Sequence, residues 1–163
     1  MKHAQQRWLL VSAVVLLSLL VVAIARGNHQ QTTVRWVIGS SASALAQDDS
    51  KITVTGSGTF VLGELDEVTG GGTWETFDEN GNSTGNGTYR VTSLVRFDEG
   101  PPFPPAGLAL LRVAYDDGSR GVLVVSCHGP GSPDSMAEGI VASKGFVLYW
   151  NHIEAAAFFQ LVE

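Results

Sequence analysis

From residue 51 onward, apolar and polar side chains alternate in short runs separated by turns rich in glycine and aspartate. In the first run, residues 51–63, one side carries apolar side chains and glycines at a period of two: Ile52, Val54, Gly56, Gly58, Phe60 and Leu62. A period of two over this length predicts a half-buried β-strand. The glycines within it favour a bulge or a close approach of another backbone.

Turn signals between the later runs predict three hairpins. Their turns lie at Asn80-Gly81, at the DDGS sequence of residues 116–119, and at Lys144-Gly145. Asn-Gly and Asp-Gly between alternating runs are strong short-range hairpin signals. The strand after the first turn is expected to present one apolar face, made of Tyr89, Val91, Val95 and Phe97. The last apolar run, AFFQLV, favours a closing strand over a helix.

Counted together, these runs predict seven or eight strands, and no segment among them has a sustained helical period. The proline-rich connection DEGPPFPPAG, residues 98–107, cannot lie in a central ladder. Short strands joined by short turns are typical of an all-β fold. We therefore expect an antiparallel meander that forms a barrel or a sandwich, because closure would protect the edge strands.

An uncharged apolar run from Trp8 to Ala25 follows basic residues near the N-terminus. This is the pattern of a secretory signal, and its 18 residues are also enough for a hydrophobic helix that anchors the chain in a bilayer. Cleavage motifs of the A-x-A form end at Ala25 and at Ala46. We expect residues 1–46 to be a signal sequence or anchor plus a linker, and residues 47–163 to be one exported domain.

The charge changes at the same boundary. Residues 1–46 contain four basic and no acidic residues, whereas residues 47–163 contain six basic and sixteen acidic ones, a net charge of −10. Such a balance argues against nucleic acid and anionic lipid as partners. We therefore expect contact with a membrane only through residues 8–25, if that segment is retained. The sequence does not determine the oligomeric state.

The pair Cys127–His128 ends an aliphatic run and is a candidate for reactive chemistry. Adjacent side chains in a strand point to opposite faces, so Cys127 faces the core if Leu123 and Val125 do, and His128 then points outward. A buried cysteine acts as a small hydrophobe, which is the favoured interpretation. The alternatives are a redox or intermolecular disulfide role, and a nucleophile or metal ligand acting with His128 or His152.

Other candidate motifs are incomplete. Asp78, Asn80 and Asn82 have the spacing of the first calcium ligands of an EF-hand loop, but Ser83 and Tyr89 replace its glycine and its bidentate acid. Asn82 and Asn86 begin glycosylation sequons, which matter only in a host that uses them. Without C-x-x-C or H-x-x-x-H spacing, we expect no metal site and no cofactor.

Inward-facing aromatic residues offer the most physical route to a function. The interior of a barrel of about eight strands is either filled or holds one small ligand. The candidate ligand-binding residues are Trp74, Tyr89, Tyr115, His128, Trp150 and His152. The leading hypothesis is non-enzymatic binding of an apolar or amphipathic small molecule. The alternatives are an envelope structural or interaction module tethered by residues 8–25, and an enzyme that uses Cys127 or the pair His128/His152.

Two resemblances accompany this interpretation. The region 52–151, most specifically DGSRGVLVVSCH and GIVASKGF, resembles a group of small exported bacterial β-rich proteins of unknown function. That resemblance implies export and supplies no catalytic residues. The pattern GGTW followed by GNGTY resembles lipocalin-like and avidin-like proteins. It implies, at the level of the fold, a small barrel that binds a ligand.

Overall fold

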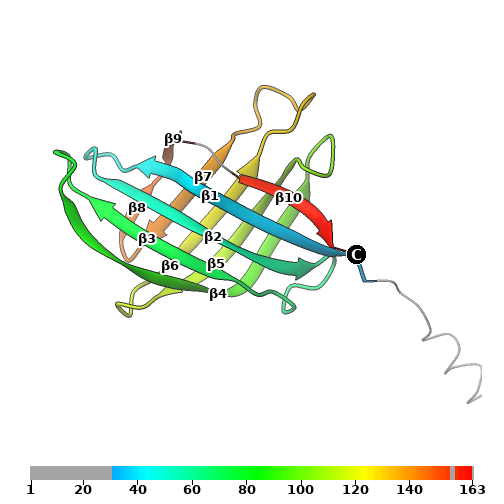
Figure 1. Cartoon of the computed structure of the whole chain (residues 1–163), viewed down its shortest axis with the longest axis horizontal. Helices are drawn as coiled ribbons and strands as arrows, with labels where there is room; N and C mark the ends of the chain where they lie inside the picture. The colour runs from blue at the N-terminus through cyan, green and yellow to red at the C-terminus, as the bar shows by residue number, and fades with distance from the viewer. Residues whose placement is uncertain (1–30, 155–156, 163) are drawn as a thin grey trace, which may run out of the picture. The chain divides into compact units, whose positions relative to one another are not determined.

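The computed structural model describes residues 31–154 and 157–162, and its compact unit spans Thr32–Glu163. The expected leader at residues 8–25 lies outside the described residues. One antiparallel sheet of ten strands makes up the fold (Figure 1). The strands are β1 (Thr33–Leu45), β2 (Lys51–Val61), β3 (Gly71–Phe77), β4 (Ser83–Glu99), β5 (Gly107–Tyr115), β6 (Arg120–Cys127), β7 (Gly139–Lys144), β8 (Val147–Tyr149), β9 (Asn151–Glu154) and β10 (Ala157–Val162). Within the described part, no helix is long and apolar enough to cross a membrane.

The predicted all-β antiparallel meander is confirmed. The hairpins β3–β4, β5–β6 and β7–β8 turn at the three predicted places, and β10 coincides with AFFQLV. Inward side chains of β2 also follow the predicted period, because Ile52, Val54 and Phe60 are buried. The prediction of seven or eight strands is too low, because the described residues form ten, with β1 in the expected linker and β9 as a separate short strand.

The predicted closed barrel is wrong. The hydrogen-bonded order runs β10-β1-β2-β3-β4-β5-β6-β7-β8 and does not return on itself. The sheet curls so that β1 contacts β7 and β10 contacts β6 (Figure 1). After the short β8, the chain leaves β7 at Trp150, whose N–H donates to the Leu45 carbonyl at 3.0 Å, and β9 then pairs with β1. The ladder stops because this segment changes partners after three residues.

The predicted domain boundary at residue 47 also needs correction. Residues 33–45, expected in the linker, form β1, which pairs with β2, β9 and β10. Its inward side chains are all buried: Val34, Trp36, Ile38, Ala42 and Ala44. A register shift between Ile38 and Ala42 interrupts the period, and small residues fill the interruption. Cleavage after Ala46 would remove this strand from between β10 and β2.

Strand β4 does not keep the single apolar face predicted for it. Two register shifts, between Val91 and Ser93 and between Leu94 and Arg96, rotate its second half. Leu94 is therefore buried, whereas Val95 is only half-buried. Such bulges bend a strand and increase its twist. Pairing with β3 ends near Arg90, so residues 95–99 have no neighbouring strand on that side in the described sheet.

The core under β1, β2 and β3 is organised around Trp36, which is fully buried. Trp36 stands opposite Gly58, and a Cβ built on Gly70 would lie 2.5 Å from its Cζ2 atom. Gly70 also has a φ of 131°, which side chains rarely adopt. The indole Nε1 has no hydrogen-bond partner within the described chain. These glycines leave the space that the ring occupies.

Substitution at Gly70 tests this packing. Gly70→Ala should lower the free energy of unfolding by roughly 2–4 kcal/mol, because the methyl overlaps Trp36 and the backbone becomes strained. Gly63→Ala is the matched control, since Gly63 also has a positive φ, 85°, but no atom within 4 Å of a built Cβ. It should cost only about 1 kcal/mol. Because a Cβ on Gly70 would also lie 2.6 Å from the Ser57 carbonyl oxygen, the difference between the two losses reports both overlaps, and equal losses in urea denaturation would show that neither contributes.

Candidate functional site

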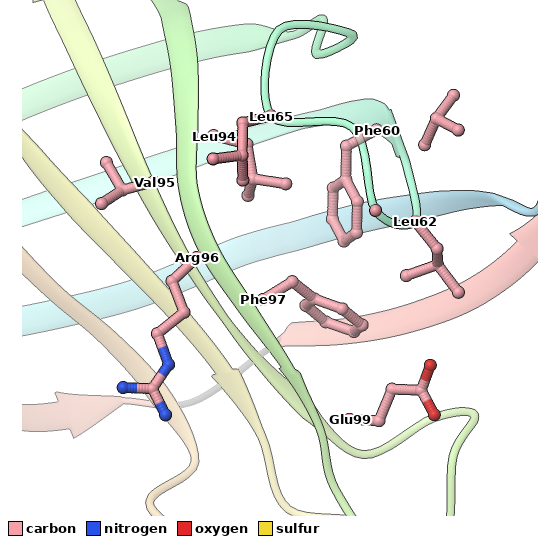
Figure 2. A pocket seen from close by; sticks show the side chains of 10 residues that line it. Phe60, Leu62, Leu65, Leu94, Val95, Arg96, Phe97 and Glu99 are labelled. Atoms are coloured by element: carbon pink, nitrogen blue, oxygen red, sulfur yellow. The ribbon is translucent and has the colours of Figure 1, made fainter.

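A cleft of about 390 Å³ opens between the end of β2, the segment 62–70 that follows it, and the bulged half of β4 (Figure 2). Most of its lining is apolar, and the polar side chains are those of β4. The lining residues are Phe60, Val61, Leu62, Gly63, Leu65, Leu94, Val95, Arg96, Phe97 and Glu99. The cleft exists because β4 separates here from the strand that precedes it in the sheet.

The floor of the cleft is aromatic and backed by the core. The rings of Phe60 and Phe97 lie side by side, with centroids 4.7 Å apart (Figure 2). Behind them, Phe97 packs on Phe159 at 5.2 Å and on Phe103 at 5.6 Å, both in edge contacts. Aromatic pairs at these distances stabilise one another beyond the area they bury. The floor is therefore held by four separate segments of the chain.

The rim of the cleft is open and polar. Leu65 is 54% exposed, and the chain beneath it is tied to β4 by a bond from the Leu94 N–H to the Leu65 carbonyl at 3.3 Å. Arg96 pairs with Asp98 at 2.6 Å and points away from the phenylalanines (Figure 2). Glu99 is exposed at the far end. An edge of unpaired backbone groups beside an apolar floor suits a molecule with both apolar and polar parts.

The structure brings three of the predicted site residues together, at the other end of the sheet. Tyr115 lies 5.9 Å from Trp74 and 6.2 Å from Tyr89 between ring centroids. The Tyr89 hydroxyl donates to the Thr55 carbonyl at 3.0 Å, and the Tyr115 hydroxyl donates to the Ser143 carbonyl at 2.9 Å. Burial raises the pKa of both phenols. The three rings pack on one another as core.

Polar groups complete this aromatic cluster. Trp74 Nε1 donates to Asp116 Oδ1 at 3.0 Å, and the Thr88 N–H donates to Asp116 Oδ2 at 2.8 Å. These bonds, the one from Thr88 first, hold the pKa of Asp116 below its usual value. Lys144 Nζ lies 4.0 Å from the centre of the Trp74 ring and forms an ion pair with Asp117. The lysine thus connects β7 to β3 across the inside of the curled sheet.

The other three predicted residues lie elsewhere. Half-buried His128 follows the end of β6, and its N–H donates to the Glu138 carboxylate. Trp150, 55% exposed, stands between β8 and β9. His152 is exposed on β9, in register with Ala44. None of these three residues, nor any of the aromatic cluster, lines the cleft.

Cys127 faces the core, as its strand position predicts, and is buried. Burial, followed by the nearby Glu138 carboxylate, raises the pKa of its thiol to about 11. A nucleophilic cysteine needs a lowered pKa and exposure. Among the residues placed by the structure, no group of three or more His, Cys, Asp or Glu side chains is arranged to hold a metal ion.

Sequence reasoning assigned the cleft residues to the core or to a loop. Phe60, Leu62 and Phe97 do fall on inward positions, and only the two bulges of β4 open the space beside them. No periodic signal marks those bulges. Comparison with known proteins adds no assignment, because no family model, curated protein or solved structure matches the chain.

The reactivity of Cys127 can be measured directly. At mildly alkaline pH, a disulfide reagent should label the native thiol roughly 100-fold more slowly than the urea-unfolded thiol, because a raised pKa leaves little thiolate and burial excludes the reagent. Absorbance of the released thiolate reports the rate. Rapid labelling of the native protein would restore the nucleophile interpretation.

The ion pair of Lys144 and Asp117 should make the free energy of unfolding depend on pH in the acidic range. The hydrogen bond from Lys144 is the main reason that the pKa of Asp117 falls to about 2. A lowered carboxyl pKa in the folded state stabilises the protein above the unfolded pKa, and this contribution is lost as pH falls from about 4 through about 2. The slope of unfolding free energy over that window should flatten in Asp117→Asn and in Lys144→Met. Wild-type slopes in both variants would exclude the pair as the cause.

Proposed function

We propose that this protein binds a small amphipathic molecule in the cleft between segment 62–70 and β4, without converting it chemically. The observation that carries the proposal is the cleft itself, whose apolar floor of Phe60 and Phe97 lies next to an unpaired stretch of β4. Its volume falls within the range of sites for small molecules, roughly 300–1,000 Å³. The ligand-binding hypothesis from the sequence is kept, and its site moves from the interior to this cleft.

The arrangement favours a ligand with a compact apolar body and a polar group at one end. The apolar body would displace water from the accessible parts of Phe97, Leu62 and Leu65, which are among the less buried apolar side chains of the lining. The polar group would reach the free backbone groups of β4 or the rim beside Arg96 and Glu99. Burial of apolar area supplies the affinity, and the polar contacts set the orientation of the ligand.

Leu65 is the sharpest test position, because it lines the cleft and is 54% exposed, so the fold does not depend on it. With anilinonaphthalene sulfonate as the probe, Leu65→Asp should weaken saturable binding about ten-fold, since burying a leucine side chain contributes roughly 1.5–3 kcal/mol. Fluorescence titration of the full chain gives the dissociation constants.

Leu161→Asp is the matched control, a leucine 46% exposed on β10 and outside the cleft. Both variants keep the same N-terminal segment, so the difference between them reports on the cleft. Binding that is equally weakened in the two variants, or weakened only by Leu161→Asp, would refute this site.

A further inference from the structure

The outer surface of β4–β8 carries an unusual combination of arginines and apolar side chains. Cross-strand register places Arg90, Ala114 and Arg120 in one row across β4, β5 and β6. A second row consists of Arg112 on β5 and Val122 on β6. A third runs from Arg96 through Leu110 and Val124 to Val141, which lies on β7. Side chains of one face alternate with those of the core, so all three rows point away from it.

The β7–β8 hairpin extends this surface with larger apolar groups. Leu148 pairs with Ser143 on the outside of β7. Phe146, in the hairpin turn, is 100% exposed, and Leu148 and Trp150 are each 55% exposed. We call the combined surface the basic–apolar face: Arg90, Arg96, Arg112, Arg120, Leu110, Val122, Val124, Val141, Phe146, Leu148 and Trp150. Contiguous exposed apolar groups of this kind mark interaction sites.

Three of the four arginines of this face form no ion pair within the described residues, although the domain as a whole is acidic. Residues 32–163 contain seven basic and sixteen acidic residues, and four of the seven are the arginines of this face. Within the described residues, Arg90, Arg112 and Arg120 form no ion pair, and only Arg96 does, with Asp98. In the adjoining β5–β6 turn, Asp117 pairs with Lys144, whereas Asp116 accepts hydrogen bonds from Trp74 and Thr88 and keeps its negative charge. The three arginines without an ion pair outnumber this carboxylate, so the face is locally positive despite the net charge of the domain.

A second copy of the chain fits this face poorly. An isologous contact would place the arginines of one copy against the same patch on the other, where Asp98 is already paired with Arg96 and Asp48 lies beside Leu148 and Trp150. The face is also the outside of a curled sheet, so two such convex surfaces would meet over a small area. A bilayer surface with anionic headgroups suits the face better, because it supplies more negative charge and receives aromatic and aliphatic side chains at the interface.

We propose that the basic–apolar face docks on the surface of a bilayer that contains anionic phospholipid. Phe146, Leu148 and Trp150 enter the interface, and the arginines pair with the headgroups. Each arginine near an anionic surface contributes about 1 kcal/mol to the free energy of binding. This proposal differs from the prediction made from net charge, that contact with a membrane is limited to residues 8–25, because it rests on the distribution of charge over one face.

The test measures the depth of the β7–β8 turn rather than vesicle binding, since an apolar N-terminal segment could itself bind vesicles. A nitroxide is attached to the full chain at Phe146→Cys in a Cys127→Ala background. The chain is mixed with phosphatidylcholine vesicles with or without phosphatidylglycerol. Power saturation should show more collisions with oxygen and fewer with a water-soluble nickel chelate, only when phosphatidylglycerol is present. A label at Leu65→Cys, outside the face, should stay accessible to nickel on both vesicles.

Charge reversal completes the design. In Arg112→Glu/Arg120→Glu, the partition constant of the position-146 label on anionic vesicles should fall by at least about 30-fold, because two arginines at about 1 kcal/mol each are lost and two repelled carboxylates are added. A position-146 label that remains accessible to nickel on anionic vesicles would overturn the proposal. So would a dimer of the full chain that the charge reversal dissociates, because the face would then be a contact between copies. The probe titration of Leu65 and Leu161 tests the cleft independently of this result, because neither residue belongs to the basic–apolar face.

Discussion

The close approach of three strands around Trp36 is the constraint on which the rest of the structure depends. A Cβ on Gly58 would lie 2.1 Å from the Thr69 carbonyl, and one on Gly72 would lie 1.8 Å from the Thr55 carbonyl. A side chain at either position would overlap the neighbouring backbone, so only glycine fits there. Glycines inside strands mark tight bends and close backbone approach. The sheet curls so that β1 contacts β7, and Trp36 of β1 is fully buried.

The curl of the sheet explains why the cleft lies beside the second half of β4. A sheet that bends this strongly cannot keep every neighbouring pair of strands in register over their full length, and β4 resolves the conflict with two bulges. Its first half stays with β3, while its second half follows β5. Segment 62–70 fills part of the gap, and the remainder is the candidate binding site. Around Tyr115 the strands remain paired, and the rings of Trp74 and Tyr89 contact its ring.

Much of the fold could be predicted from the sequence, and the candidate site could not. Alternation and turn residues are local properties, so the hairpins, the inward face of β2 and the buried position of Cys127 followed from them. Strand β1 was not predicted, because Ser40, Ser41 and Ser43 are typical of a linker and a bulge breaks the period of two. The sheet stays open because the chain changes partners at Trp150, and the cleft forms because β4 changes register within its length. Those choices are set by long-range packing and leave no periodic mark.

The pairing of β1 with β10 has a consequence for how the chain assembles. Thr33 lies opposite Val162, so one ladder joins the two ends of the described domain. Contacts between residues so far apart in sequence slow folding, since the chain between them must be ordered before they form. Until β10 arrives, β1 presents an open edge and the phenylalanine floor lacks Phe159. A chain synthesised in sequence order would therefore complete its sheet only after β10 has emerged from the ribosome, and a chaperone that shields this edge would be of most use in that interval.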